Sequence, residues 1–156
     1  MIEENKKYNT TVPSEEFQQC KAAIHLVCAD LILGGYNAFQ ADSGLPYNVL
    51  VGHGSEFVRI KVKSTLSPKT VSKSKNVYCF PTRRAKRNRR VVEAGEFDYF
   101  ALVALDIKKI AYLKLEEVTS KTTGKIVQMI TMRSKQFTYG TAPGRYIEDY
   151  GWLEEI

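Results

Sequence analysis

The chain has 156 residues, a formal net charge of +6 and 44% apolar residues, a composition typical of one ordinary globular domain. No stretch reaches the roughly 18 uncharged apolar residues that a membrane-spanning helix needs, which excludes an integral helical membrane protein. The first residues carry acids with no apolar segment behind them, so we expect no signal peptide and a cytoplasmic protein.

The three cysteines, Cys20, Cys28 and Cys79, do not have the pattern of a disulfide framework. Their number is odd, and a cytoplasmic location keeps thiols reduced. Cys20 and Cys28 are eight residues apart, whereas the cysteines of a zinc site are usually about two to four apart. We therefore predict buried free thiols and no metal.

The N-terminal part of the chain predicts an arm followed by an amphipathic helix. Residues 1–13 form the arm, Ser14 has the residue type of an N-cap, and Gly34-Gly35 ends the helix. Apolar residues recur at the spacing of one helix face: Phe17, Cys20, Ile24, Val27, Cys28, Leu31 and Ile32. That face is expected to pack on the core.

Three strands are predicted next, at 36–40, 47–51 and 57–63, with a turn at 52–55 between the last two. The third strand alternates with period two. Val58, Ile60 and Val62 share one face, which we expect in the core. The opposite face carries the polar side chains and one aromatic ring: Phe57, Arg59, Lys61 and Lys63.

Residues 64–96 interrupt this pattern and are predicted to form a basic loop or hairpin insertion, in which 76–80 has the composition of a strand. Further strands are predicted at 97–105, 110–113 and 125–133, and a short helix carrying Trp152 at 146–156. The aromatic side chains of these strands are interpreted as core rather than as base-stacking groups: Tyr78, Phe80, Tyr99 and Phe100. The fold class is α/β, with residues 14–156 as one domain around a central mixed sheet flanked by helices.

Several short motifs recur in the order found in one nuclease family. They are Leu31, Gly35-Tyr36, Tyr47-Asn48-Val49-Leu50-Val51, Lys61-Val62-Lys63-Ser64-Thr65, 98–103 and 110–118. Across residues 17–118 the chain resembles the PD-(D/E)XK superfamily, and within it the group of the cyanobacterial group I intron homing endonuclease. The resemblance implies a restriction-endonuclease-like fold and a DNA partner.

The resemblance also implies a magnesium site that this chain does not retain. Such enzymes hold the ion with carboxylates from the helix and from two strand ends, and the ion activates water for phosphodiester cleavage. The corresponding positions are Ile24, Asn48 and Lys61, and only Lys63 of the usual set remains. We therefore expect no cofactor and a chain that does not cut DNA.

Lys61 and Lys63 are then candidate phosphate contacts, and a second basic cluster follows in the insertion. Its cations are Arg83, Arg84, Lys86, Arg87, Arg89 and Arg90. We expect double-stranded DNA as partner, a role in transcription regulation, and a homodimer or homotetramer, the last by analogy with the resembled group.

Two alternatives to this interpretation stay open. An active magnesium-dependent endonuclease remains conceivable if other acids, of which Asp30 is the best placed, supply the ligands. An RNA-binding or purely structural protein is the other, since the arginine cluster also suits RNA or a solvated loop.

Overall fold

The computed structural model describes residues 14–71, 74–83, 95–137 and 143–153. Its first element is the helix α2 (Glu15–Leu33), which begins where the sequence predicts: the Ser14 side chain accepts a hydrogen bond from the Phe17 N–H at 3.2 Å. Gly34 caps the other end and Gly35 has φ +93°, a conformation that favours glycine. Both helix boundaries are confirmed.

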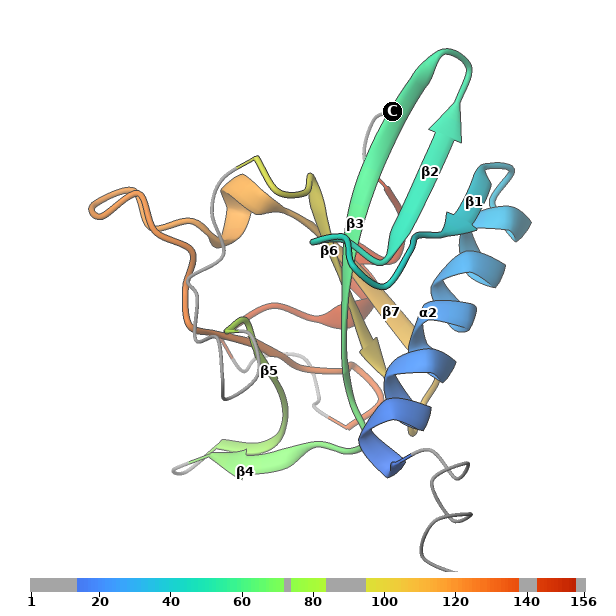
Figure 1. Cartoon of the computed structure of the whole chain (residues 1–156). Coiled ribbons are helices and arrows are strands. Elements are labelled where there is room, and N and C mark those ends of the chain that lie inside the picture. The colour runs from blue at the N-terminus through green and yellow to red at the C-terminus, as the bar shows by residue number, and fades with distance from the viewer. Residues whose placement is uncertain (1–13, 72–73, 84–94, 138–142, 154–156) are drawn as a thin grey trace, which may run out of the picture.

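A five-stranded sheet lies against this helix (Figure 1). Its strands, in spatial order, are β1 (Asn37–Gln40), β2 (Val49–His53), β3 (Glu56–Thr65), β6 (Tyr99–Ala104) and β7 (Lys109–Lys114). Only the β3–β6 pair is parallel, so the sheet is mixed, as predicted. The structure thus has the expected α/β class, with the helix on one face of a mixed sheet.

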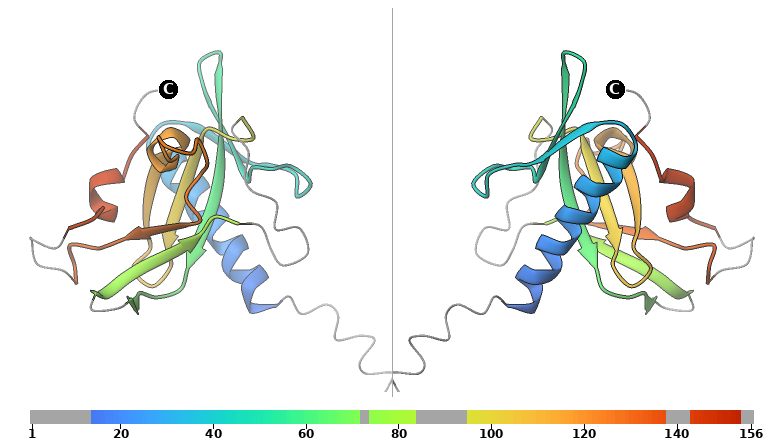
Figure 2. Two further views of the ribbon diagram at one scale, coloured as in Figure 1. Left: turned by 90° about the vertical axis from the view of Figure 1, so that its left-hand side faces the viewer. Right: turned by 90° about the vertical axis from the view of Figure 1, so that its right-hand side faces the viewer.

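The strand β3 pairs with two different neighbours along its length. Its first half, from Glu56 to Ile60, pairs with β2, and its second half, from Ile60 to Thr65, pairs with β6. The outer part of the β2–β3 hairpin therefore extends beyond β6, and it is flanked by β1, which pairs with β2 as far as Gly52 (Figures 1 and 2). Gly54, with φ +65°, lies in its turn.

A second, antiparallel sheet contains part of residues 64–96, the segment that the sequence predicts as an insertion. Its strands are β4 (Lys69–Val71), β5 (Ser74–Pro81) and β8 (Met129–Met132). Part of 64–96 is therefore sheet and not loop, because β5 finds its partner in β8, far along the chain. The strand predicted at 125–133 is shorter than expected, since pairing with β5 covers only residues 129–132.

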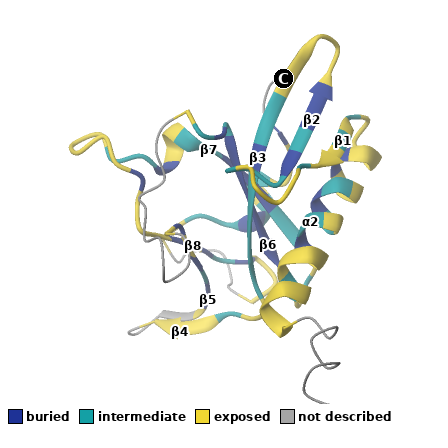
Figure 3. Cartoon of the chain, in the orientation of Figure 1, coloured by how far each residue is buried: buried dark blue, intermediate teal, exposed yellow. Residues whose placement is uncertain are grey.

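The two faces of the large sheet have separate cores. The helix side is built from α2 and from alternate residues of β2, β3 and β6, among them Val27, Val49, Ile60 and Ala101. The other side joins β6 and β7 to the second sheet and contains Tyr78, Phe80, Phe100 and Leu113. Every residue of β6 is buried, because this strand lies between both cores (Figure 3). Tyr78, Phe80, Tyr99 and Phe100 are core residues, as predicted.

The apolar face predicted for the helix packs only in part. Burial along α2 begins at Ala23, so its first two turns extend past the sheet, and Phe17 is 58% exposed. Ile32 is 55% exposed at the other end. Cys20 is exposed while Cys28 and Cys79 are half-buried, so the prediction of buried thiols is wrong for Cys20; all three are free. Burial raises the pKa of the Cys28 thiol.

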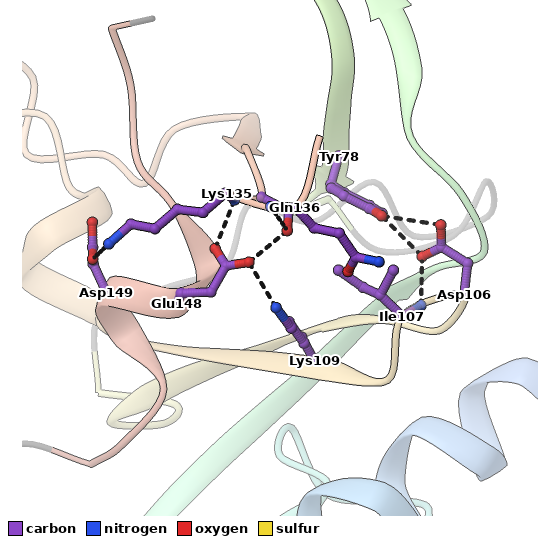
Figure 4. Close-up of polar contacts among 9 residues, drawn as sticks. Tyr78, Asp106, Ile107, Lys109, Lys135, Gln136, Glu148 and Asp149 are labelled. Atoms are coloured by element: carbon purple, nitrogen blue, oxygen red, sulfur yellow. Dashed lines mark hydrogen bonds and ion pairs between the residues drawn. The ribbon is translucent and has the colours of Figure 1, made fainter. Parts of the chain in front are cut away.

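The C-terminal segment is held by a carboxylate network rather than by the predicted helix. Its only regular element among the described residues is the 3₁₀ turn η3 (Ile147–Tyr150), and Trp152 is 57% exposed. Glu148 accepts hydrogen bonds from the Ser134 hydroxyl, from Lys109 Nζ at 2.9 Å and from the Lys135 N–H at 3.1 Å (Figure 4). These contacts attach the turn to β7 and to the residues that follow β8.

A further carboxylate lies in the turn between β6 and β7 (Figure 4). Asp106 accepts hydrogen bonds from the Tyr78 hydroxyl at 3.0 Å to each carboxylate oxygen, and Lys135 forms an ion pair with Asp149. Burial by itself raises the pKa of Glu148, but the hydrogen bonds from Ser134, Lys109 and the Lys135 N–H lower it to about 2. The name carboxylate network is used below for these acids and their neighbours, which are Asp106, Lys109, Ser134, Lys135, Glu148 and Asp149.

Candidate nucleic-acid interface

The β2–β3 hairpin brings together three of the four residues expected at the lost metal site. Asn48 directly precedes β2, its N–H donates to the Ile60 carbonyl at 2.9 Å, and the register places it across from Lys61. Lys61 and Lys63 pair with Phe100 and Leu102 of β6. Strand alternation therefore puts Asn48, Lys61 and Lys63 on the sheet face away from α2.

Ile24, the fourth residue, lies on the other side of the sheet. Its side chain is half-buried and packs against the core under α2. Asp30, the best acid for a displaced ligand, is also on the helix, and its carboxylate accepts a hydrogen bond from the Tyr112 hydroxyl at 2.6 Å. Burial, and then this bond, raise the pKa of Tyr112. The structure therefore does not bring Asp30 to Asn48 and the lysines.

Asn48 uses its side-chain oxygen to hold the hairpin together. Oδ1 accepts a hydrogen bond from the Val62 N–H at 2.9 Å, and only the oxygen end of the amide can accept from this donor. The side chain thus bridges the start of β2 to the middle of β3. An asparagine does this without the negative charge that an aspartate would bring.

An ion pair beside the lysines was not anticipated from the sequence. The Arg59 guanidinium meets the Asp98 carboxylate at 3.1 Å (Nη2 to Oδ1) and 3.2 Å (Nε to Oδ2), and the Arg59 N–H donates to Oδ2 at 2.8 Å. Burial alone raises the pKa of Asp98, but the bonds from Arg59 outweigh it and lower the pKa. Alternation of β3 could have placed Arg59 on this face, whereas its partner comes from the start of β6.

The same arginine also holds Gly95, which follows the basic cluster in the chain. Arg59 Nη1 donates to the Gly95 carbonyl at 2.8 Å, so the chain returns from the cluster directly beside β3. The near end is also placed, since Arg83 follows Thr82, whose N–H donates to the Gln128 carbonyl at 3.1 Å. The cations between these ends lie outside the described residues: Arg84, Lys86, Arg87, Arg89 and Arg90.

The name lysine face is used below for Asn48, Arg59, Lys61 and Lys63. Both lysines are half-exposed, and neither is without a polar partner. The donor set of this face, one amide oxygen already bonded to backbone and three cations, does not suit Mg²⁺, which prefers carboxylate oxygens. Among the described residues, no three His, Cys, Asp or Glu side chains cluster as metal ligands would. A surface of this kind suits an anion.

The described helix is too polar or too short to cross a membrane. No family model matches the chain, and no curated protein matches it.

Three solved protein chains match the structure. One of them is described as the structure of a bacterial homing endonuclease, I-Ssp6803I, with a TM-score of 0.61 and 14% sequence identity. The match covers 89% of this chain and 87% of that one, so it extends over most of both chains. Identity this low establishes the fold alone, and on that basis the protein has the fold of a homing endonuclease.

Proposed function

We propose that this protein binds double-stranded DNA without cutting it. One observation carries the proposal: in a fold shared with an endonuclease, the hairpin face holds an amide, Asn48, and a lysine, Lys61, at positions where the PD-(D/E)XK resemblance requires metal ligands, beside the retained Lys63. Removing carboxylates from a surface that meets phosphates strengthens its attraction for DNA, and each added lysine strengthens it further. Lys61 then has two effects, since it excludes a divalent cation and attracts a phosphate.

The basic cluster supplies the second part of the proposed interface. Its described end, Arg83, and its return point, Gly95, bracket five further cations. Guanidinium groups bind phosphates and also recognise guanine O6 and N7 in the major groove, which gives a route to sequence specificity. The proposed biological role is therefore a cytoplasmic DNA-binding regulator of transcription, derived from a homing endonuclease.

The proposal includes assembly as a homodimer or homotetramer. Its support is the exposure of single apolar side chains on the end of α2, on β1 and on the outer hairpin, where Leu33 is 89%, Phe39 57% and Phe57 63% exposed. Closed symmetry is the usual solution for such oligomers, and it matches two-fold symmetric DNA sites. Light scattering during size-exclusion chromatography tests this part, and a monomer at micromolar concentration contradicts it.

The test of DNA binding is fluorescence anisotropy with a 30-base-pair duplex and an RNA duplex of the same sequence, over a salt series. Wild type is expected to bind DNA more tightly than RNA, with an affinity that falls steeply with salt. A variant with Arg83, Arg84, Arg87, Arg89 and Arg90 changed to glutamine should lose about a hundredfold at low salt. Equal affinity for RNA, or binding that survives this variant unchanged, rejects the proposal.

The competing function is a nuclease that uses displaced ligands. Supercoiled plasmid is incubated with the protein and either Mg²⁺ or Mn²⁺, and no specific cleavage is expected. Cleavage that disappears in the K63A variant, but not in K21A on the helix side, would make the protein an active endonuclease. Selection of bound sequences from a random duplex pool then reports the specificity directly.

A further inference from the structure

A hollow of about 320 Å³ lies between the end of β5 and the turn at residues 120–125. It is lined by Thr82, Arg83, Ser120, Thr123, Lys125, Ile126, Val127 and Gln128. It belongs neither to the lysine face nor to the carboxylate network. None of the described residues that line it is acidic, and two are cations, so its charge favours an anionic group.

Hydrogen bonds to backbone carbonyls hold the segments that carry the two cations. The Thr82 hydroxyl donates to the Val127 carbonyl at 2.6 Å, which holds Arg83 beside the 126–128 segment. The Ser120 N–H donates to the Lys125 carbonyl and the Gly124 N–H to the Ser120 carbonyl, both at 2.8 Å, which holds the turn before Lys125. Gly124 has φ +66°, so the turn that presents Lys125 depends on glycine.

The polar groups that line the hollow have the donor types that a phosphodiester needs. Neither Arg83 nor Lys125 forms an ion pair within the described part of the chain, and both side chains are exposed. The Ser120 and Thr123 oxygens accept backbone N–H bonds at 3.4 Å and 3.3 Å, so their hydroxyl hydrogens remain able to donate to a ligand. Cations and hydroxyls together are the usual contacts to nucleic-acid phosphates.

The hollow also lies on the same side of the large sheet as the lysine face. Ile126, in its wall, belongs to the core that includes Phe100 and Leu102, the strand partners of Lys61 and Lys63. Both basic regions therefore lie on the side of the large sheet away from α2 (Figure 2). An extended polyanion can meet both without passing around the molecule.

We infer that this hollow is a second phosphodiester-binding site, in which Arg83 and Lys125 bind one backbone phosphate of a nucleic acid. The inference rests on the proposed function for the identity of its ligand as duplex DNA. It adds Lys125, Ser120 and Thr123 to the contact surface, three residues that no sequence motif indicated.

The experiment compares two variants that lose the same charge. K125Q removes the cation in the hollow, and K21Q removes an exposed lysine on α2, on the opposite side of the sheet. Binding to the 30-base-pair duplex is measured by anisotropy from low to moderate salt. K125Q should bind about five- to tenfold more weakly at low salt and lower the slope of log affinity against log salt by about 1. K21Q should change affinity less than twofold.

A second measurement keeps the site testable if duplex binding fails. Amide NMR signals of ¹⁵N-labelled wild type are followed during titration with a single-stranded hexanucleotide and, separately, with inorganic phosphate. We expect signals of residues 120–128 to shift with the hexanucleotide at lower concentration than with phosphate.

The possible outcomes separate the two proposals. Duplex binding with equal K125Q and K21Q affinities and unshifted 120–128 signals overturns the site and leaves the function standing. No duplex binding, together with hexanucleotide shifts at 120–128, supports the site and overturns the function. Shifts that inorganic phosphate produces equally well reject a phosphodiester site in favour of general anion binding, and no shift with any probe rejects the site.

Discussion

Two polar regions flank the buried strand β6, and they differ in their balance of charge. Before β6, the lysine face has three cations, Arg59, Lys61 and Lys63, and one carboxylate beside it, Asp98, which pairs with Arg59. After β6, the carboxylate network has three carboxylates, Asp106, Glu148 and Asp149, for two lysines. The network uses its charges to join three segments of the fold. The lysine face leaves positive charge at the surface, which is what a partner with many phosphates requires.

The largest effect on stability is expected from the carboxylate network. E148A leaves the fully buried Ser134 hydroxyl and the Lys109 ammonium without their acceptor, so it should lower the free energy of unfolding by about 2 kcal/mol. Urea unfolding measures the change. E116A, at an exposed acid of η2 (Leu115–Val118), is the control and should cost less than about 0.5 kcal/mol. Equal losses in both variants would mean that the network contributes nothing specific.

The same carboxylate predicts how stability depends on pH. Its folded pKa of about 2 is below the ordinary value of 4.5, so on acidification the unfolded state takes up the proton first. The stabilisation from Glu148 is therefore complete above about pH 4.5 and is lost as pH falls towards 2. Urea unfolding between pH 2 and 6 should give a weaker pH dependence for E148Q than for wild type, and parallel curves would contradict the assignment.

Substitutions in the lysine face should change the affinity for DNA rather than the stability of the fold. K61Q/K63Q is expected to weaken duplex DNA binding by about tenfold or more at low salt, and to lower the salt slope by about 2. The matched variant K21Q/K108Q removes two exposed lysines elsewhere and should change affinity less than threefold. If both double variants bind alike, net charge alone explains binding and the lysine face has no special role.

The ion pair next to the lysines should have a smaller effect, on stability. Because the Asp98 side chain is 39% exposed, solvent screens its interaction with Arg59, and D98N should cost about 1 kcal/mol. The asparagine still accepts the Arg59 N–H. Thermal unfolding measures the loss, and the same preparation should bind DNA at least as tightly as wild type, since a negative charge is gone. Weaker binding would show that Asp98 positions the interface.

The smallest effects are expected from two substitutions of Asn48, one that removes its hydrogen-bond acceptor and one that adds a negative charge. N48A loses the bond to the Val62 N–H and should cost about 1 kcal/mol, whereas N48D keeps an acceptor there and should stay within about 0.5 kcal/mol of wild type. Chemical denaturation compares the two. A larger loss for N48D than for N48A would mean that this position does not tolerate a carboxylate.

The sequence by itself determined the local elements whose signals lie close together in the chain. Ser14 and Gly35 delimit α2 because capping needs a side-chain oxygen at one end and a left-handed residue at the other. The alternation from Val58 to Lys63 set which face of β3 carries cations, since side chains alternate across a strand. Both follow from local stereochemistry, and both are confirmed.

Only the tertiary structure decided the features that depend on distant partners. The strand β5 needs β8, which is about fifty residues later. Among the described C-terminal residues the regular element is the 3₁₀ turn η3, whose Glu148 bonds to Lys109 of β7 and to Ser134, which follows β8. The same is true of the basic surfaces: Arg59 meets Asp98, and Arg83 and Lys125 line one hollow, only after the chain has folded back. Charge pattern predicted which residues are cationic, and long-range pairing determined where they meet.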